Sequence, residues 1–231
     1  MRLERYGKVN ILPVMAAPLE CGDHLRARID PLMTGIGPVE AALVLGAELA
    51  RLEAKGELPD LILSLGSCGS PTLDHAAVYQ ASSVSYRDMD ASALGFPKGV
   101  TPLLDRPAVM SLPCPIPDVP TARLSTGANV VSGAAYDSID ADMVDMETWA
   151  LLRAAQMFAI PLVALRGVSD GKAELTGLDD WRSPLVQVDE TLAVALDRLI
   201  VVLEAGGLAA LDNQAQQGQD PAASLSPEPA A

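Results

Sequence analysis

Three acidic residues border an otherwise apolar stretch of this sequence. Asp145 and Glu147 open the segment 144–170, and Asp170 ends it. A carboxylate among apolar residues is costly to bury unless it is paired or bound to something. Carboxyl groups in such places can transfer protons or hold polar ligands. We therefore interpret these acids first as candidate functional groups.

Each acid also has a structural explanation. Asp145 would lie near a helix start, where the helix dipole favours an anion. Asp170 would cap the segment that follows it. Glu147 is harder to explain in this way, because it lies beside Met146 and near Trp149 in an apolar predicted helix. The sequence favours a functional role for Glu147 and leaves both interpretations open for the other two.

Composition excludes several classes of protein. The chain has 231 residues and a formal net charge of −14, which opposes binding to nucleic acid and to anionic membrane surfaces. It contains no apolar run long enough for a transmembrane helix and no pattern typical of a signal peptide. Cys21, Cys68 and Cys114 have no metal-ligand spacing, and a reducing cytoplasm is expected. With two histidines, a zinc site or a Ser-His-Asp triad has few candidate residues.

The elements that must position the acids alternate between strand and helix. Apolar runs predict strands within 8–18, 59–70, 76–88, 121–133 and 160–170, and a further short strand before the glycine turn at Gly35 and Gly37. Helical spacing predicts helices after that turn, over 144–159 and over 183–207. This pattern predicts a single-domain, three-layer α/β/α fold with a central mixed sheet. We expect the domain to span 1–211 and the polar segment 212–231 to be a disordered tail.

Several predicted strand ends carry glycine or polar residues, at 35–37, 66–70, 127–129 and 169–171. Open α/β sheets bind ligands outside the carboxyl ends of their strands. Glycines there let backbone amides approach a ligand closely. The alternatives are plain turns, or at 35–40 a dinucleotide fingerprint, although "GIGPVE" lacks its third glycine.

Taken together and in order, these motifs resemble the nucleoside phosphorylase and nucleosidase superfamily, and within it the 5′-methylthioadenosine/S-adenosylhomocysteine nucleosidases. The matching segments are "TGIGPVEAAL", "LGSCGS", "YRDMDASALGF", "LSTGANVVSG" and "VDMET" with the later "RGVSDG". The resemblance runs from about residue 8 to residue 200. It implies a mixed sheet flanked by helices, a homo-oligomer with a dimer favoured, and a purine nucleoside as the small-molecule partner. It implies neither a cofactor nor a metal.

The resemblance also implies roles for individual residues. Asp170 is similar to the acid that protonates, or hydrogen-bonds, the purine N7, and Glu147 to the carboxylate that binds the ribose hydroxyls. An acid at N7 neutralises the leaving base, while the carboxylate stabilises an oxocarbenium-like sugar. Glu20 is the candidate for the base that activates water, if an insertion displaces it. The implied substrate-binding set is Met146, Asp145, Ser169, Ser67, Gly69, Val130, Val131 and Gly35.

The sequence departs from this family in three places. Pro18 stands where the nucleosidases have their water-activating glutamate, two residues before Glu20. Val130 replaces the aromatic residue that stacks on the purine. Leu94 replaces the aromatic residue that a neighbouring subunit would contribute, although Phe96 is close by.

Three other functions are kept as alternatives. A phosphate-dependent phosphorylase would use "GSCG" and the arginines Arg26 or Arg28, with Arg87 as a possible anion partner, but Ser64 stands where a phosphate-binding arginine is expected. A nucleoside-binding protein with little catalysis would explain the uncertain base and the missing aromatic. A fold whose acids are structural would need no ligand at all. Hydrolysis that releases adenine is the preferred interpretation.

Overall fold

Strands and helices alternate along the chain as the apolar pattern requires. The computed structural model describes residues 1–171, 173 and 176–211. In this part of the chain the strands are β1 (Glu4–Tyr6), β2 (Val9–Met15), β3 (Leu32–Met33), β4 (Leu61–Ser70), β5 (Val78–Tyr86), β6 (Val109–Ser111), β7 (Thr121–Thr126), β8 (Met143–Asp145) and β9 (Leu162–Gly171). The helices are α1 (Asp23–Arg26), α2 (Pro38–Glu53), α3 (Thr148–Met157), α4 (Leu178–Arg182) and α5 (Leu185–Gly206). Short 3₁₀ turns lie at Pro18–Glu20, Ser92–Leu94 and Gly133–Ser138.

The strands form one mixed sheet. Its order is β1-β2-β4-β8-β7-β5-β6, with β3 beside β2 and with β9 paired to both β4 and β5. The strands β2, β4 and β9 run parallel to one another, and so do β5, β7 and β8. The β5–β9 and β4–β8 pairs are antiparallel and join these two groups. This connection brings the carboxyl ends of strands from both groups towards one region.

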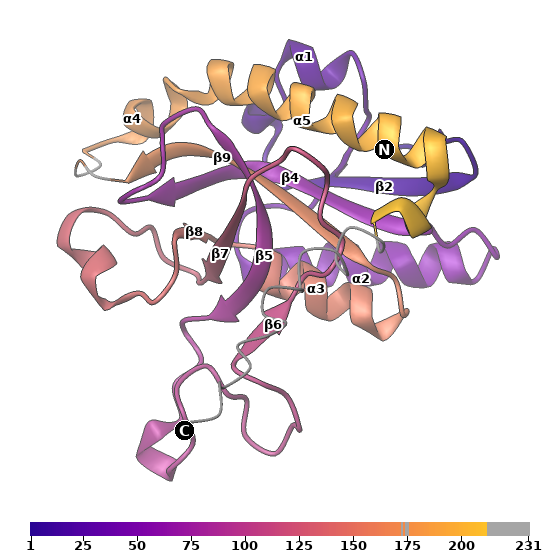
Figure 1. Ribbon diagram of the computed structural model, residues 1–231. Coiled ribbons are helices and arrows are strands. Elements are labelled where there is room, and N and C mark those ends of the chain that lie inside the picture. The colour runs from indigo at the N-terminus through magenta and orange to yellow at the C-terminus, as the bar shows by residue number, and fades with distance from the viewer. Residues whose placement is uncertain (172, 174–175, 212–231) are drawn as a thin grey trace, which may run out of the picture.

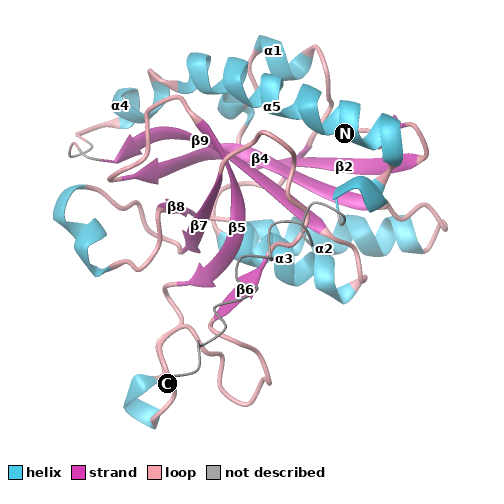
Figure 2. Cartoon of the chain, in the orientation of Figure 1, coloured by secondary structure: helices cyan, strands magenta, loops and turns pink. Residues whose placement is uncertain are grey.

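Helices cover both faces of the sheet (Figures 1 and 2). The helices α2 and α3 lie on one face, and α5 with α1 lies on the other. Side chains of β4 alternate between the two cores: Ile62 joins the core under α2 and α3, whereas Leu61 and Leu63 join the core under α5. Such strands are apolar throughout because both faces are buried. The predicted three-layer α/β/α fold is confirmed.

The segment around the acids differs from the expected single helix over 144–159. Residues Met143–Asp145 form β8, which pairs in parallel with β7, and α3 begins only at Thr148. The Asp145 carboxylate accepts a hydrogen bond from the backbone N–H of Thr148, which fixes the start of the helix. The prediction was wrong here because pairing to a strand distant in sequence overrides local helical spacing.

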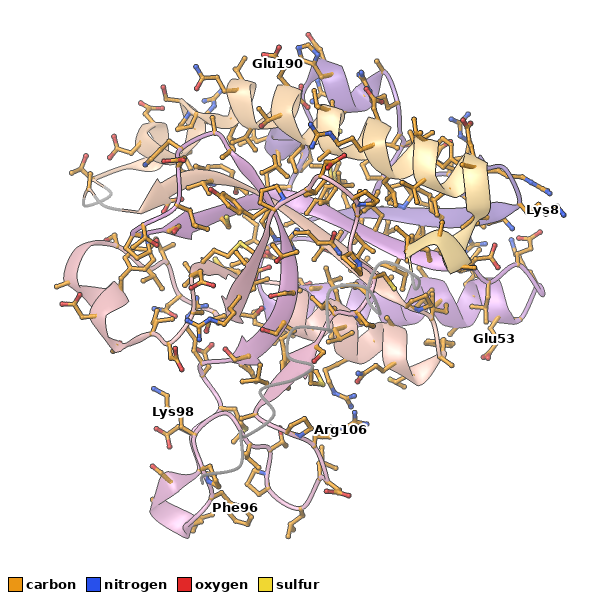
Figure 3. The ribbon with its side chains drawn as sticks, in the orientation of Figure 1. Lys8, Glu53, Phe96, Lys98, Arg106 and Glu190 are labelled. Carbon is orange, nitrogen blue, oxygen red and sulfur yellow. The ribbon has the colours of Figure 1, made fainter. Side chains whose placement is uncertain are left out.

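A long connection between β5 and β6 projects away from the sheet (Figure 3). Phe96 and Lys98 lie in the part of this connection that projects furthest from the sheet. Leu94 in the same connection is 77% exposed. The aromatic residue that the sequence offered near Leu94 therefore lies in a projecting loop.

The expected tail, 212–231, lies outside the described residues, so the predicted domain boundary stays a prediction. Within the described part of the chain, no helix combines the length and the apolar character needed to cross a membrane.

Candidate active site

A cavity of about 560 Å³ opens at the carboxyl ends of β2, β4, β5, β7, β8 and β9. Its walls include nine of the residues predicted from the sequence: Glu20, Ser67, Gly69, Val130, Val131, Asp145, Met146, Glu147 and Asp170. Gly35 and Ser169 lie behind the walls. Gly35 donates its backbone N–H to the carbonyl of Ala16, and Ser169 is buried under Asp170. The strand topology thus brings together residues from five separate segments.

Glu20 is placed at the cavity by the 3₁₀ turn that follows β2. Its side chain is buried, and Oε1 accepts hydrogen bonds from the backbone N–H of Ser67 at 2.8 Å and from Ser67 Oγ at 2.7 Å. Oε2 accepts the backbone N–H of Ala17 at 3.3 Å. The turn Pro18–Glu20 therefore brings Glu20 to the cavity, although Glu20 lies two residues after the position where the nucleosidases have their glutamate.

Trp181 completes this group from a helix that sequence reasoning did not connect with the site. Its indole N–H donates to Ser67 Oγ at 3.0 Å, so the Ser67 hydroxyl accepts from Trp181 and donates to Glu20. Trp181 and Leu178 of α4 also form part of the cavity wall. No motif marked Trp181, because its role depends on how α4 packs beside β9 and brings the indole to Ser67 of β4.

Glu147 lies at the start of α3 and faces the cavity. Its Oε1 accepts the backbone N–H of Gly37 at 2.9 Å. Burial, together with the nearby Asp145 carboxylate, raises the pKa of Glu147 to about 8, while the Gly37 hydrogen bond opposes the shift. A carboxyl group poised near neutral pH can exchange between neutral and ionised forms when a ligand changes its surroundings.

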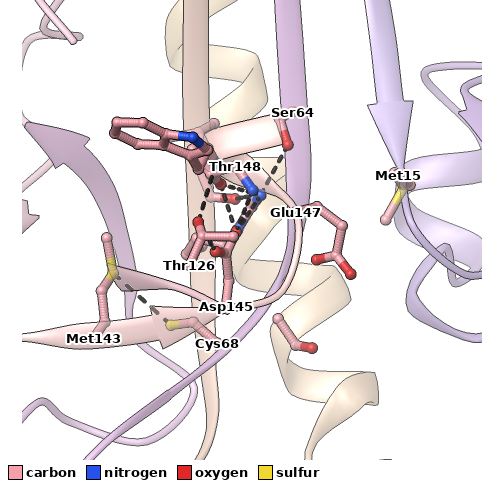
Figure 4. A network of polar contacts seen from close by, with 12 residues as sticks. Met15, Ser64, Cys68, Thr126, Met143, Asp145, Glu147 and Thr148 are labelled. Atoms are coloured by element: carbon pink, nitrogen blue, oxygen red, sulfur yellow. Dashed lines mark hydrogen bonds and ion pairs between the residues drawn. The ribbon is translucent and has the colours of Figure 1, made fainter. Parts of the chain in front are cut away.

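Asp145 belongs to a buried polar network beneath the cavity (Figure 4). Its Oδ2 accepts hydrogen bonds from Arg166 Nε at 3.1 Å and Arg166 Nη2 at 3.0 Å, and Oδ1 accepts from Thr126 Oγ1 at 2.6 Å. Arg166 also donates to Ser64 Oγ and Thr148 Oγ1. These bonds engage both carboxylate oxygens, so the geometry gives Asp145 a positioning role beneath Met146 and Glu147.

Sequence reasoning missed Arg166, although a signal was present. It is the single charged residue within the apolar run of β9 before Asp170, and it is 2% exposed. A buried guanidinium needs an anionic partner. The nearby unexplained acid, Asp145, was that partner.

Asp170 ends β9 opposite Gly69 of β4. Its Oδ1 accepts a hydrogen bond from Ser169 Oγ at 2.7 Å. Burial raises the pKa of Asp170, whereas the Ser169 hydrogen bond and the charge of His75 oppose the shift. The net upward shift favours the protonated acid that could donate a proton to a ligand in the cavity.

The loop after β7 is held by Arg87. The guanidinium donates to the backbone oxygens of Ser125, Asp145, Gly127 and Asn129 and to the side-chain oxygen of Asn129. These bonds use all five N–H groups of an arginine. The loop then presents Val130, 67% exposed, at the cavity, while Val131 is buried. Arg87 therefore shapes the wall and has no N–H left for an anion.

Comparison with known proteins finds a family model and a relative that this chain resembles. Residues 119–205 match the family model of the phosphorylase superfamily. A 5′-methylthioadenosine/S-adenosylhomocysteine nucleosidase of Baumannia cicadellinicola subsp. Homalodisca coagulata is 26% identical over 191 residues, which cover 74% of this chain and 80% of the relative.

Solved structures share the fold. Futalosine hydrolase of Helicobacter pylori strain 26695 superposes with a TM-score of 0.68 at 19% identity, covering 83% of this chain and 97% of that one. A 5′-methylthioadenosine/S-adenosylhomocysteine nucleosidase of Colwellia psychrerythraea 34H, in complex with adenine, gives a TM-score of 0.61 at 19% identity, covering 91% and 98%. The resemblance found in the sequence motifs agrees with the family match over residues 119–205, and the solved structures confirm the fold.

Proposed function

From its likeness to the phosphorylase superfamily, we propose that this protein hydrolyses the N-glycosidic bond of 5′-methylthioadenosine, S-adenosylhomocysteine or a related purine nucleoside. The observation that carries the proposal is the convergence of Glu20, Glu147 and Asp170 on one cavity of about 560 Å³. A cavity of this size is suited to a ligand as large as a nucleoside. Its relatives include a nucleosidase by sequence and an adenine complex by fold.

Asp170 is proposed as the acid that protonates the purine N7. Breaking the bond between the sugar and the base leaves negative charge on the base, and a proton at N7 neutralises it. The raised pKa of Asp170 keeps a proton available at higher pH than an ordinary aspartate would. Ser169 holds Oδ1, which orients the carboxyl group.

Glu147 is proposed to bind the ribose hydroxyls, with Met146 packed on the sugar. Positive charge that develops on the ribose favours the ionised form of Glu147, whose pKa is otherwise about 8. Interaction that strengthens as charge develops lowers the barrier rather than only tightening substrate binding.

Glu20 is proposed to accept a proton from the attacking water. The water oxygen bonds to the sugar carbon as the bond to the base breaks, and its proton passes to Glu20. Ser67 and Ala17 hold the carboxylate through three hydrogen bonds. The same arrangement supports Ser67 and Gly69 as part of the wall that holds this water.

The positions and partners of the candidate phosphate-binding arginines favour water over phosphate as the nucleophile. Arg28 pairs with Asp197, and Arg26 pairs with Asp23 and donates to the carbonyl of Pro18, so neither forms part of the cavity wall. Arg87 is the one cation among the described lining residues, and backbone and amide oxygens occupy its donors. The described lining residues therefore offer no free cation to bind a phosphate.

The proposal is tested by measuring base release from methylthioadenosine, adenosylhomocysteine, adenosine, inosine and futalosine, each with and without phosphate. Free base without phosphate is expected, and Asp170→Asn is expected to lower kcat by roughly 10²–10⁴-fold. If sugar 1-phosphate forms, and only in the presence of phosphate, the protein is a phosphorylase and the proposal of hydrolysis is wrong. Tight nucleoside binding without turnover would instead support a nucleoside-binding protein with little catalysis.

The substrate scan also decides between the relatives. Both a methylthioadenosine nucleosidase and a futalosine hydrolase share this fold. Adenine released from the methylthio or homocysteine substrate supports our preference, while release only from futalosine would move the assignment to the other substrate class.

We also propose a homo-oligomer, with a dimer favoured, located in the cytoplasm. Support for the assembly comes from exposed apolar side chains beside the cavity. Ile36 in its wall is 55% exposed, and Val39 and Leu43 of α2 are 67% and 63% exposed. Light scattering after size-exclusion chromatography measures the mass, and a monomer at assay concentration would refute the assembly.

A further inference from the structure

Tyr136 carries a buried hydroxyl that nothing in the proposed mechanism uses. The residue lies in the 3₁₀ turn Gly133–Ser138, is 6% exposed, and packs with Val131 and Val144. Within the described residues, its hydroxyl oxygen is the one buried side-chain polar atom without a hydrogen-bond partner. Because an unbonded buried hydroxyl is costly, such a group calls for an explanation in function.

The hydroxyl points at the space beside the proposed acid. A Cβ atom added at Gly69 would lie 2.2 Å from the Tyr136 hydroxyl oxygen and 2.9 Å from Asp170 Oδ2. The two oxygens therefore face the same small space, which is open because residue 69 has no side chain. The register shift between Cys68 and Gly69 sets Gly69 opposite Asp170 and so creates this arrangement.

The other oxygen of Asp170 is already engaged. Ser169 Oγ donates to Oδ1 at 2.7 Å, which leaves Oδ2 to face Gly69 and Tyr136. A phenol can donate one hydrogen bond, and an ionised carboxylate is its strongest natural acceptor. The two oxygens are not hydrogen-bonded in this structure, so the bond requires a small shift of the Tyr136 or Asp170 side chain into the space beside Gly69.

We propose that Tyr136 is a positioning residue whose hydroxyl donates a hydrogen bond to Asp170 Oδ2 once Asp170 has given its proton to the base. The inference rests on the proposed function. In that step the Asp170 O–H bond breaks, the proton bonds to N7, and the bond between the sugar and the base breaks with its electron pair passing to the base. Asp170 is left as an anion in a buried place, and Tyr136 stabilises that anion.

The charged groups around the pair are consistent with this role. Burial raises the pKa of Tyr136, and the Asp170 charge and Cys68 raise it further, while Arg87 opposes the shift. The phenol therefore stays protonated and remains a donor. Burial likewise raises the pKa of the Cys68 thiol, which stays neutral. Ser169 and His75 both act to lower the pKa of Asp170, against the effect of burial.

The test compares wild type with Tyr136→Phe by two readouts. Carboxyl ¹³C NMR gives the pKa of Asp170, with Asp170→Asn used to assign the signal. Because the lost bond stabilises the ionised form by roughly a factor of ten, we expect this pKa to rise by about one unit in Tyr136→Phe. In the base-release assay we expect kcat to fall about tenfold, KM to stay within about twofold, and the alkaline limb of the kcat profile to move to higher pH.

Tyr6→Phe is the matched control, because Tyr6 lies on β1 against the other core and outside the cavity wall. It is expected to change neither readout. Tyr136→Phe removes only an unbonded oxygen, so its thermal unfolding midpoint should equal or exceed that of wild type.

An unchanged Asp170 pKa in folded Tyr136→Phe would overturn the inference. A raised pKa in a protein whose wild type releases no base would support the hydrogen bond and refute the proposed hydrolysis. A lower kcat with an unchanged Asp170 pKa would assign Tyr136 a packing role and also overturn the inference.

Discussion

Arg166 and Asp145 form an ion pair in which both side chains are almost fully buried, with 3% and 1% exposed. Two charges withdrawn from water interact strongly, but each depends on the other because solvent cannot replace a lost partner. The pair lies directly beneath Met146 and Glu147, so it supports the part of the wall that is proposed to hold the sugar.

Replacing Arg166 by methionine should therefore be strongly destabilising. Asp145 would stay buried without its cation, and we expect the free energy of unfolding to fall by about 3–5 kcal/mol. Urea unfolding measures the change. Arg28→Met is the control, because it breaks a more exposed pair with Asp197 and should cost about 0–1 kcal/mol. Equal losses in both variants would contradict the importance assigned to the buried network.

Glu147 predicts a pH dependence of stability. Its pKa of about 8 in the folded protein exceeds the ordinary value of 4.5, so the folded state holds this proton more tightly than the unfolded state does. Between these two pKa values the folded chain binds more protons, and the stability contributed by Glu147 falls as pH rises. Across that range the contribution falls by up to about 1.4 kcal/mol for each rise of one in pH.

Urea unfolding of wild type and Glu147→Gln at pH 5 and pH 8.5 checks this expectation. Glutamine cannot ionise, so the variant should gain stability relative to wild type as pH rises. A difference between the two proteins that is the same at both pH values would show that Glu147 does not hold its proton in the folded state.

At the scale of elements, the start of α2 holds Glu147 in place. Gly37 precedes Pro38, has a φ of +100°, and donates its backbone N–H to Glu147. Residues with a side chain rarely adopt this conformation. The contact thus depends on a backbone shape that only glycine adopts readily, and it joins α2 to the start of α3.

Gly37→Ala should destabilise the protein by about 1–3 kcal/mol, because alanine is strained at this positive φ. A steric clash is not the cause, since the added Cβ would meet no atom within 4 Å. Gly46→Ala is the matched control. It also has open space around its Cβ, but it lies inside α2 with ordinary helical geometry, so it should stabilise by up to about 1 kcal/mol. Thermal unfolding of both variants gives the signs. Stabilisation by both would contradict the strain argument.

At the scale of the whole molecule, two cores on opposite faces of one sheet support the cavity. The strands whose ends meet at the cavity all lie in this sheet, and buried residues of α3 and α5 complete the cores. The described chain ends soon after α5, at Leu211, which is itself buried. The described residues that line the cavity all precede residue 212.

A chain shortened to 1–211 should therefore retain the site. Because the polar composition of 212–231 predicts a disordered tail, we expect the thermal midpoint of the shortened chain to lie within about 2 °C of that of the full chain. Its base-release rate should also be unchanged. Loss of activity or a change in mass by light scattering would show that 212–231 takes part in catalysis or assembly.

Local pattern was enough to determine much of this protein. The alternation of apolar runs predicted the α/β/α layers, because burial on both faces of a sheet leaves a mark on consecutive residues. Glycine and polar residues at strand ends predicted which edge would hold the site. Asp170 and Glu147 stood out because a carboxylate in an apolar run needs a reason.

Only the tertiary structure decided which groups meet. Strand register paired Asp145 with Thr126 and made a strand of a segment whose spacing suggested a helix. The packing of the whole fold pairs Arg166 with Asp145 and brings the Trp181 indole to Ser67. It also places Tyr136 and Asp170 on either side of the space beside Gly69. The partners in each case are far apart in the sequence, and a hydrogen bond depends on positions to within a fraction of an ångström. Local sequence patterns show which residues of a strand or helix are buried, but they do not give the distance between two residues that are far apart in the chain. The packing of the whole sheet determines that distance.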